Sequence, residues 1–306
     1  MDTPAPSATD PGSVRRPRLP NGARPRAGLL RNPPGPTRSS YAPCDEYGGR
    51  AHHREFQLER LKVGETAEHC GWLYYDADDQ GRARRYWGEA LTTATVLGDD
   101  NLAIMVLASL SMQASYEGRP RQGLALAQAA QERAVRYGSP MLQSLLASRA
   151  ARALSLLNDQ TGAKKRLTES MRLVERDGRG RPSPEWAAFH GHAELDYTQG
   201  LLYTEAGHHH SAVTFLRAAL AHQDRTYGRN RALYRLTLSR SLVRAGEADE
   251  AAAEAVESLE HLEEVESGRV NRRLKEVTGL LRGVDTTAAR DAADQLTEFA
   301  ELSGVA

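Results

Sequence analysis

A pattern of small residues that returns about every 40 positions constrains this chain more than any other feature of its sequence. The clearest copy has Gly71 and Tyr74, a turn at residues 78–81, and then Ala83 and Trp87. Small residues let two helices approach closely, and a large ring fills the space between neighbouring units. The pattern therefore predicts a stack of antiparallel helix pairs.

Four further copies align with the first, each with a turn between two helical stretches. Their turns are Gly118-Arg119-Pro120, Asn158-Asp159, Ala206-Gly207 and Ala245-Gly246. Steps of about 40 residues exceed the roughly 34 of a tetratricopeptide unit, which predicts longer helices or connections between units. A segment rich in Gly, Arg and Pro, Asp177 to Pro184, lies before the fourth unit and predicts an exposed loop.

Composition supports the same fold. Aromatic residues make up 6% of the chain, and its Ala, Leu, Glu and Arg are good helix formers. We therefore expect an all-α, right-handed superhelix of the tetratricopeptide type, an α-solenoid of about five helix pairs. We assign residues 1–50 to a disordered tail rich in Pro, Gly and Arg, 51–268 to the repeat array, and 269–306 to C-terminal capping helices.

The tail carries eight arginines against four acidic residues, and its prolines oppose helix and sheet. A basic tail of this kind could contact nucleic acid or an acidic partner; the simpler interpretation is a solvated extension. The whole chain balances 40 basic against 40 acidic residues, so no global attraction to nucleic acid or acidic membranes is expected.

Cys44 and Cys70 lie in unlike contexts without metal-site spacing, which favours free thiols in a reducing cytoplasm. We found neither a membrane-spanning apolar run nor the apolar core of a signal peptide. A cytoplasmic protein without a membrane partner is expected.

Catalytic and metal motifs are missing from the sequence. It contains no P-loop, dinucleotide fingerprint, His-Glu-x-x-His helix or serine nucleophile elbow. The triplet His208-His209-His210 follows a turn, where adjacent side chains diverge, and His190 and His192 are too close in sequence to converge on one ion. We therefore predict no enzyme activity, no metal and no cofactor.

The first helix of each tetratricopeptide unit lines the concave surface, and its aromatic, Met and Arg residues suit an extended peptide or an acidic helix. For Trp72 and Met112, packing between repeats is the alternative role, whereas the arginines are expected in the groove because unpaired charges avoid burial. Reversing the charge of Arg240 and Arg244 should then weaken ligand binding without lowering thermal stability. The candidate groove residues are Trp72, Tyr75, Asp76, Met112, Tyr116, Arg152, Tyr197, Arg240 and Arg244.

Several segments resemble the tetratricopeptide region of actinobacterial, Streptomyces-like regulators. The resembling segments are Gly71–Ala77, Gln80-Gly81, Arg85-Tyr86-Trp87, Leu110–Ala114, Gly118-Arg119-Pro120 and Arg244–Glu247. The resemblance covers about residues 55–285. Those regulators join an N-terminal Cro/CI-type (XRE) helix-turn-helix domain to C-terminal repeats. The resemblance therefore implies the sensory or interaction part of a transcriptional regulator.

One difference from that family concerns DNA. Residues 1–50 contain too much Pro and Gly for a helix-turn-helix, so either the domain was lost or the start lies inside a longer gene. Sequence-specific DNA binding is therefore not expected of this chain alone. The leading hypothesis is a non-catalytic peptide- or protein-binding scaffold, and a homodimer is compatible with it. The alternative is a DNA-associated regulator that acts through the basic tail or a separate DNA-binding partner.

Overall fold

The computed structural model describes residues 46–176, 178, 180–224, 226–262 and 267–303, with side chains from Glu55 onward. The predicted disordered tail lies outside these residues except for its last five, which begin the first helix. That helix, α1, starts at Glu46 because no proline follows Pro43 before the repeats. None of the described helices is long and apolar enough to cross a membrane.

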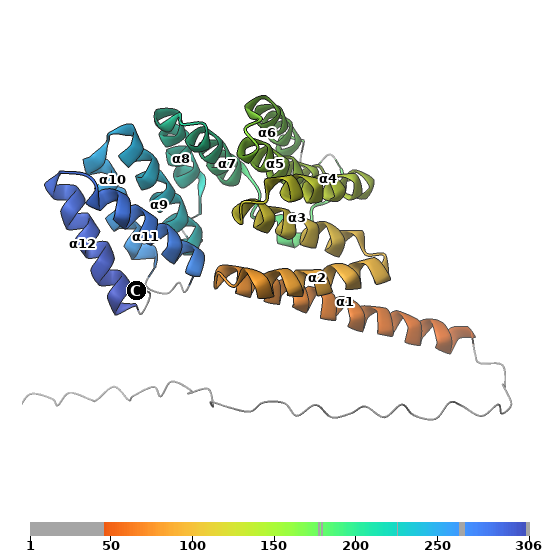
Figure 1. The fold of residues 1–306 in the computed structure, drawn as a ribbon. Coiled ribbons are helices and arrows are strands. Elements are labelled where there is room, and N and C mark those ends of the chain that lie inside the picture. The colour runs from red at the N-terminus through yellow and green to blue at the C-terminus, as the bar shows by residue number, and fades with distance from the viewer. Residues whose placement is uncertain (1–45, 177, 179, 225, 263–266, 304–306) are drawn as a thin grey trace, which may run out of the picture. The chain divides into compact units, whose positions relative to one another are not determined.

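The described part of the chain is an all-helical α-solenoid of the tetratricopeptide type (Figure 1). The first five helix pairs match the five predicted units. The sixth pair continues the stack, since α11 packs on α9 and α12 on α10. The pairs are α1 Glu46–Asp76 with α2 Gln80–Leu97, α3 Asp100–Tyr116 with α4 Pro120–Tyr137, α5 Pro140–Leu156 with α6 Gln160–Val174, α7 His192–Glu205 with α8 His209–His222, α9 Gly228–Ala245 with α10 Ala248–Glu257, and α11 Gly268–Arg282 with α12 Thr287–Leu302.

The turn inside each of the first five pairs is built in the same way. One residue in each turn adopts a positive φ: Asp78 (65°), Gly118 (73°), Asn158 (64°), Gly207 (77°) and Gly246 (89°). Glycine has no Cβ to oppose this conformation, and Asp and Asn tolerate it better than other residues. The recurrence of this turn confirms the repeat register read from the sequence.

Close packing within the pairs depends on the predicted small residues. A methyl group built on Gly71 would lie 2.5 Å from Cδ1 of Trp87, and one on Gly200 would lie 2.6 Å from Cγ of Leu216. The Trp87 indole is completely buried and donates a hydrogen bond from Nε1 to the carbonyl oxygen of Glu68 at 3.1 Å. A glycine on one helix thus makes room for a large side chain on its partner.

The segment between α6 and α7 is anchored to earlier repeats. Arg181 is exposed, as expected of a loop, but its guanidinium lies 3.9 Å from the centroid of the Tyr137 ring. Trp186 donates from Nε1 to Oδ1 of Asn101 at 3.0 Å. Arg181 thus places the predicted loop Asp177–Pro184, so far as it is described, against α4, and Trp186, two residues after the loop, is anchored to α3.

Candidate functional site

One face of the odd-numbered helices, here called the inner face, gathers charged and aromatic side chains from far apart in the sequence. Arg152 on α5 lies close enough to Tyr75 on α1, Tyr197 on α7, Arg240 on α9 and Arg273 on α11 to interact with each electrostatically. Three of these partners were candidate groove residues. The structure therefore brings Tyr75, Arg152, Tyr197 and Arg240 together.

Four arginines of this face, here called the inner arginine set, form ion pairs with glutamates, three of them across neighbouring helices and the fourth, Arg273, within α11. Among the described residues, three carboxylates serve the four guanidinium groups, because Arg240 and Arg273 share one. The pairs are Arg149 with Glu194 at 3.7 Å, Arg152 with Glu205, Arg240 with Glu276 at 3.3 Å, and Arg273 with Glu276 at 3.4 Å.

The inner arginine set is incompletely neutralised. Nε of Arg149, Nε of Arg240 and Nη1 of Arg273 are buried without a hydrogen-bond partner in the described structure. Burial lowers the pKa of Arg152 to about 10 and also lowers that of Arg240, which marks an environment that disfavours further positive charge. An added anion would reduce this cost.

Two tyrosines border the set. The Tyr197 ring stacks on Tyr234, and its hydroxyl lies 3.3 Å from Oγ1 of Thr237. The Tyr234 hydroxyl donates to Oε2 of Glu194 at 2.8 Å. Burial and the neighbouring Glu194 carboxylate raise the pKa of Tyr234. The hydrogen bond from Tyr234 fixes Glu194, which faces Arg149.

The aromatic candidates on α1 and α3 pack together. Tyr75, only 2% exposed, has its ring centroid 5.6 Å from those of Trp72 and Trp87 and 5.7 Å from that of Tyr116. Trp72, Met112 and Tyr116 are partly buried against the same apolar cluster. In this structure these side chains contribute to packing between the first two pairs.

Asp76 and Arg244 differ from the other candidates. Asp76 forms ion pairs with Arg229 and Arg269. Arg244 is exposed, unlike Arg240, whose side chain is 14% exposed and paired. Reversing the charge at 240 would set two carboxylates against each other at a buried position, so the expected unchanged stability does not follow for Arg240→Glu; neutral substitutions are the better test.

The sequence did not point to Arg149, Arg273, Glu205, Glu276 or Tyr234. Arg149 lies three residues before Arg152, so one helical turn of spacing was the available signal for it. Nothing in the sequence linked Glu205 to Arg152 or Glu276 to Arg240, because acidic residues on tetratricopeptide helices are usually solvated. Their role depends on which helices the superhelix brings together.

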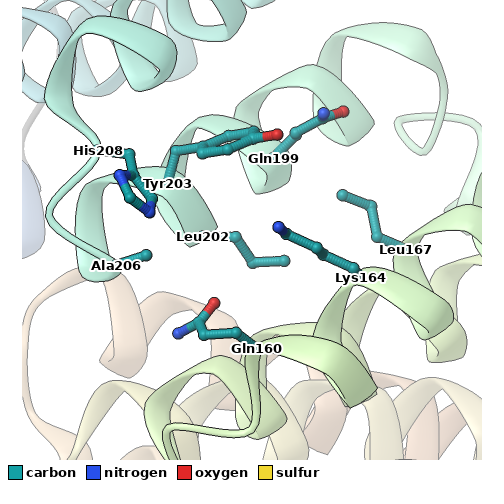
Figure 2. A pocket seen from close by; sticks show the side chains of 8 residues that line it. All are labelled: Gln160, Lys164, Leu167, Gln199, Leu202, Tyr203, Ala206 and His208. Atoms are coloured by element: carbon teal, nitrogen blue, oxygen red, sulfur yellow. The ribbon is translucent and has the colours of Figure 1, made fainter.

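A pocket lies between α6, α7 and the start of α8 (Figure 2). Lys164 and Gln160 line one wall, and Tyr203 and His208 line the opposite one. The sequence did not predict it; the insertion before the fourth unit was the available signal, since it interrupts the regular stacking. The lining residues are Gln160, Lys164, Leu167, Gln199, Leu202, Tyr203, Ala206 and His208.

Histidines occupy two contrasting places. Nε2 of His190 lies 2.9 Å from Oγ of Ser144, but both side chains are buried, and burial lowers the pKa of His190 to about 3. A buried neutral pair of this kind cannot contact a substrate and contributes to packing instead. His208 is the N-cap residue of α8, and His209 and His210 begin the helix; the described residues hold no cluster of His, Cys, Asp or Glu placed to bind a metal ion.

Comparisons with known proteins give weak likenesses. No protein-family model matches the chain, and no curated protein matches it. Among solved structures, Pseudomonas aeruginosa pilF is 14% identical with a TM-score of 0.42, over 81% of this chain and 95% of that one. The TPR2AB-domain:pHSP90 complex of yeast Sti1 is 14% identical with a TM-score of 0.33, over 80% and 96%. The fold assignment rests instead on the helix pairs and turns described above.

Proposed function

We propose that this chain is a non-catalytic interaction scaffold whose inner face binds an acidic segment of a partner peptide or protein. The observation that carries the proposal is the inner arginine set, in which four guanidinium groups share three carboxylates. Within the part of the chain that the structure describes, three of these arginines carry a buried donor nitrogen without a hydrogen-bond partner. A carboxylate of the partner would supply the missing acceptors and offset the excess charge.

A transcriptional role is a further part of this proposal. In it, the chain is the sensory or interaction part of a bacterial regulator and works in the cytoplasm. Support comes from the resemblance of Gly71–Ala77 and the other quoted segments to the actinobacterial regulators. The DNA-associated alternative depends on residues 1–50, outside the described structure, and deletion of these residues should then abolish salt-sensitive DNA binding.

Fluorescence anisotropy with a labelled deca-glutamate peptide tests the binding proposal. We expect binding that weakens with salt and is absent for deca-lysine. The double variant Arg240→Gln/Arg273→Gln should weaken binding about tenfold or more, because it removes two poorly hydrated cations. The matched control Arg166→Gln/Arg217→Gln removes the same charge from α6 and α8, where the two side chains are 38% and 51% exposed.

The control distinguishes binding at the inner face from general electrostatic attraction of the peptide to the chain. We expect it to lower affinity by less than about threefold, since exposed charges are screened. Circular dichroism and thermal melting of both double variants confirm folding. Equal losses of affinity in the two variants would refute binding at the inner face.

A further inference from the structure

The two ends of the helix array meet at five charged residues, here called the clasp. Asp76 ends α1 and Asp78 lies in the turn after it; they face Arg229 at the start of α9 and Arg269 and Arg272 at the start of α11. In Figure 1 the blue start of α11 lies beside the orange end of α1. The clasp thus joins segments more than 150 residues apart.

Asp76 is held as a bound carboxylate ligand would be. Arg269 donates to its Oδ1 from Nε at 3.1 Å and from Nη2 at 2.5 Å, and Arg229 donates to Oδ2. The Arg269 guanidinium also lies over the Tyr75 ring, 4.2 Å from its centroid. Forked arginine contacts and an aromatic platform give strong, geometrically selective carboxylate recognition. The clasp therefore contains a complete carboxylate site.

The contact between the two ends is polar. The buried apolar cluster around Tyr75 and Trp87 draws its described residues from α1 to α3, and the large C-terminal cluster draws its own from α7 to α12. Arg229 and Arg272 are 40% and 59% exposed, whereas Asp76 and Arg269 are 15% and 14% exposed, so water reaches the clasp mainly along Arg229 and Arg272. A replacement carboxylate can enter along these two arginines and take over the hydrogen bonds of Asp76 without an unpaired buried charge. The clasp can therefore open without disrupting the core of either end.

We propose that Arg229 and Arg269 form a carboxylate-binding site, which Asp76 fills in the closed array and which a carboxylate of the acidic partner fills when the clasp opens. This inference rests on the proposed function, since the same acidic segment would reach both sites. Tyr75 links them, because it interacts electrostatically with Arg269 and with Arg149 of the inner arginine set. Asp76 then competes with the ligand and lowers its apparent affinity.

Two variants break the same ion pair from its two sides. Asp76→Asn frees both arginines, whereas Arg269→Gln opens the clasp but removes one cation of the site. We expect Asp76→Asn to bind labelled deca-glutamate at least about fivefold more tightly than the wild-type chain, a typical coupling between two states. Arg269→Gln should gain nothing or lose affinity. Asp100→Asn, which removes a carboxylate paired with Arg133 between α3 and α4, is the charge-matched control.

A distance measurement follows opening without any ligand. Spin labels at Arg85→Cys on α2 and Lys275→Cys on α11, in a Cys44→Ser/Cys70→Ala background, report the separation of the two ends by double electron–electron resonance. Both side chains are exposed. We expect Asp76→Asn and Arg269→Gln to lengthen and broaden the distances, and deca-glutamate to do the same to the otherwise wild-type labelled chain.

The outcomes separate this inference from the proposed function. Unchanged distances in both clasp variants would overturn the opening of the clasp. Equal affinity of Asp76→Asn and Asp100→Asn for deca-glutamate would overturn the competition by Asp76. In either case, binding by the wild-type chain would still support the scaffold. Tighter binding by Arg269→Gln would overturn the carboxylate site, because opening alone would then explain the gain. Absence of deca-glutamate binding by every variant would overturn both.

Discussion

The phenol ring of Tyr197 on α7 lies parallel to that of Tyr234 on α9, with centroids 4.0 Å apart and an angle of 13° between the planes. This stack joins the fourth and fifth helix pairs at the edge of the inner arginine set. Tyr234 also fixes Glu194 opposite Arg149, so the stack both packs two helix pairs together and helps to position a carboxylate of the inner face.

Removing the Tyr197 ring should therefore destabilise the array. We expect Tyr197→Ala to lower the free energy of unfolding by about 3 kcal/mol, measured by chemical denaturation. Tyr197→Phe keeps the stacked ring and loses the contact with Thr237, so its cost should be about 1 kcal/mol. Equal costs for the two variants would show that the ring itself contributes little.

Glycine packing between α1 and α2 gives a second prediction. Gly71→Ala would push a methyl group into the buried Trp87 indole and should cost about 1–3 kcal/mol of stability. Gly88→Ala, an exposed position on α2 with open space for a methyl group, is the matched control. It should stabilise the chain by up to about 1 kcal/mol, because alanine is the better helix former. Thermal melts showing the two variants alike would contradict this account of the repeat.

The buried carboxyl group of Glu68 should make the stability of the folded chain depend on pH. Burial raises the pKa of this carboxyl to about 7 in the folded chain, against 4.5 as its ordinary value. Between these values the folded state holds the proton more tightly than the unfolded state, so stability is lost as the pH rises through 7. The loss approaches about 3 kcal/mol above pH 8.

Glu68→Gln should remove this loss, so denaturation at pH 5 and pH 8 should show the variant gaining stability relative to the wild-type chain as the pH rises. The difference between the two proteins is the quantity to follow, because buried His190 acts in the opposite direction. Its pKa of about 3 makes stability rise with pH up to the usual value of 6.5. Glu65→Gln, at an exposed position of α1, is the control; a constant difference between Glu68→Gln and wild type would refute the prediction.

Local features of the sequence were sufficient to predict the fold. Turn residues such as Asn158 and Gly207 and small residues such as Gly71 act within one helix pair, so their roles can be recognised from spacing alone. Arg152 and Tyr197 could be placed on the inner face by the same reasoning, since the first helix of each unit faces inward.

The ion pairs of the site could not be predicted in this way. The pairing of Asp76 with Arg269 depends on the curvature of the array, which sums small rotations between successive helix pairs. A groove-facing aspartate was the natural expectation for Asp76, whereas the structure gives it two arginines from the other end. Arg240 likewise carries a partner, Glu276, from a helix that was expected only to cap the array.

Amide hydrogen exchange on the full chain, with and without deca-glutamate, tests the binding of an acidic segment to the inner face most directly. We predict slower exchange in α5, α9 and α11, which carry Arg152, Arg240 and Arg273, and unchanged exchange in α4 and α8. Protection confined to the pocket around Lys164 and His208, or no protection in any helix, would contradict the proposed role of the inner arginine set.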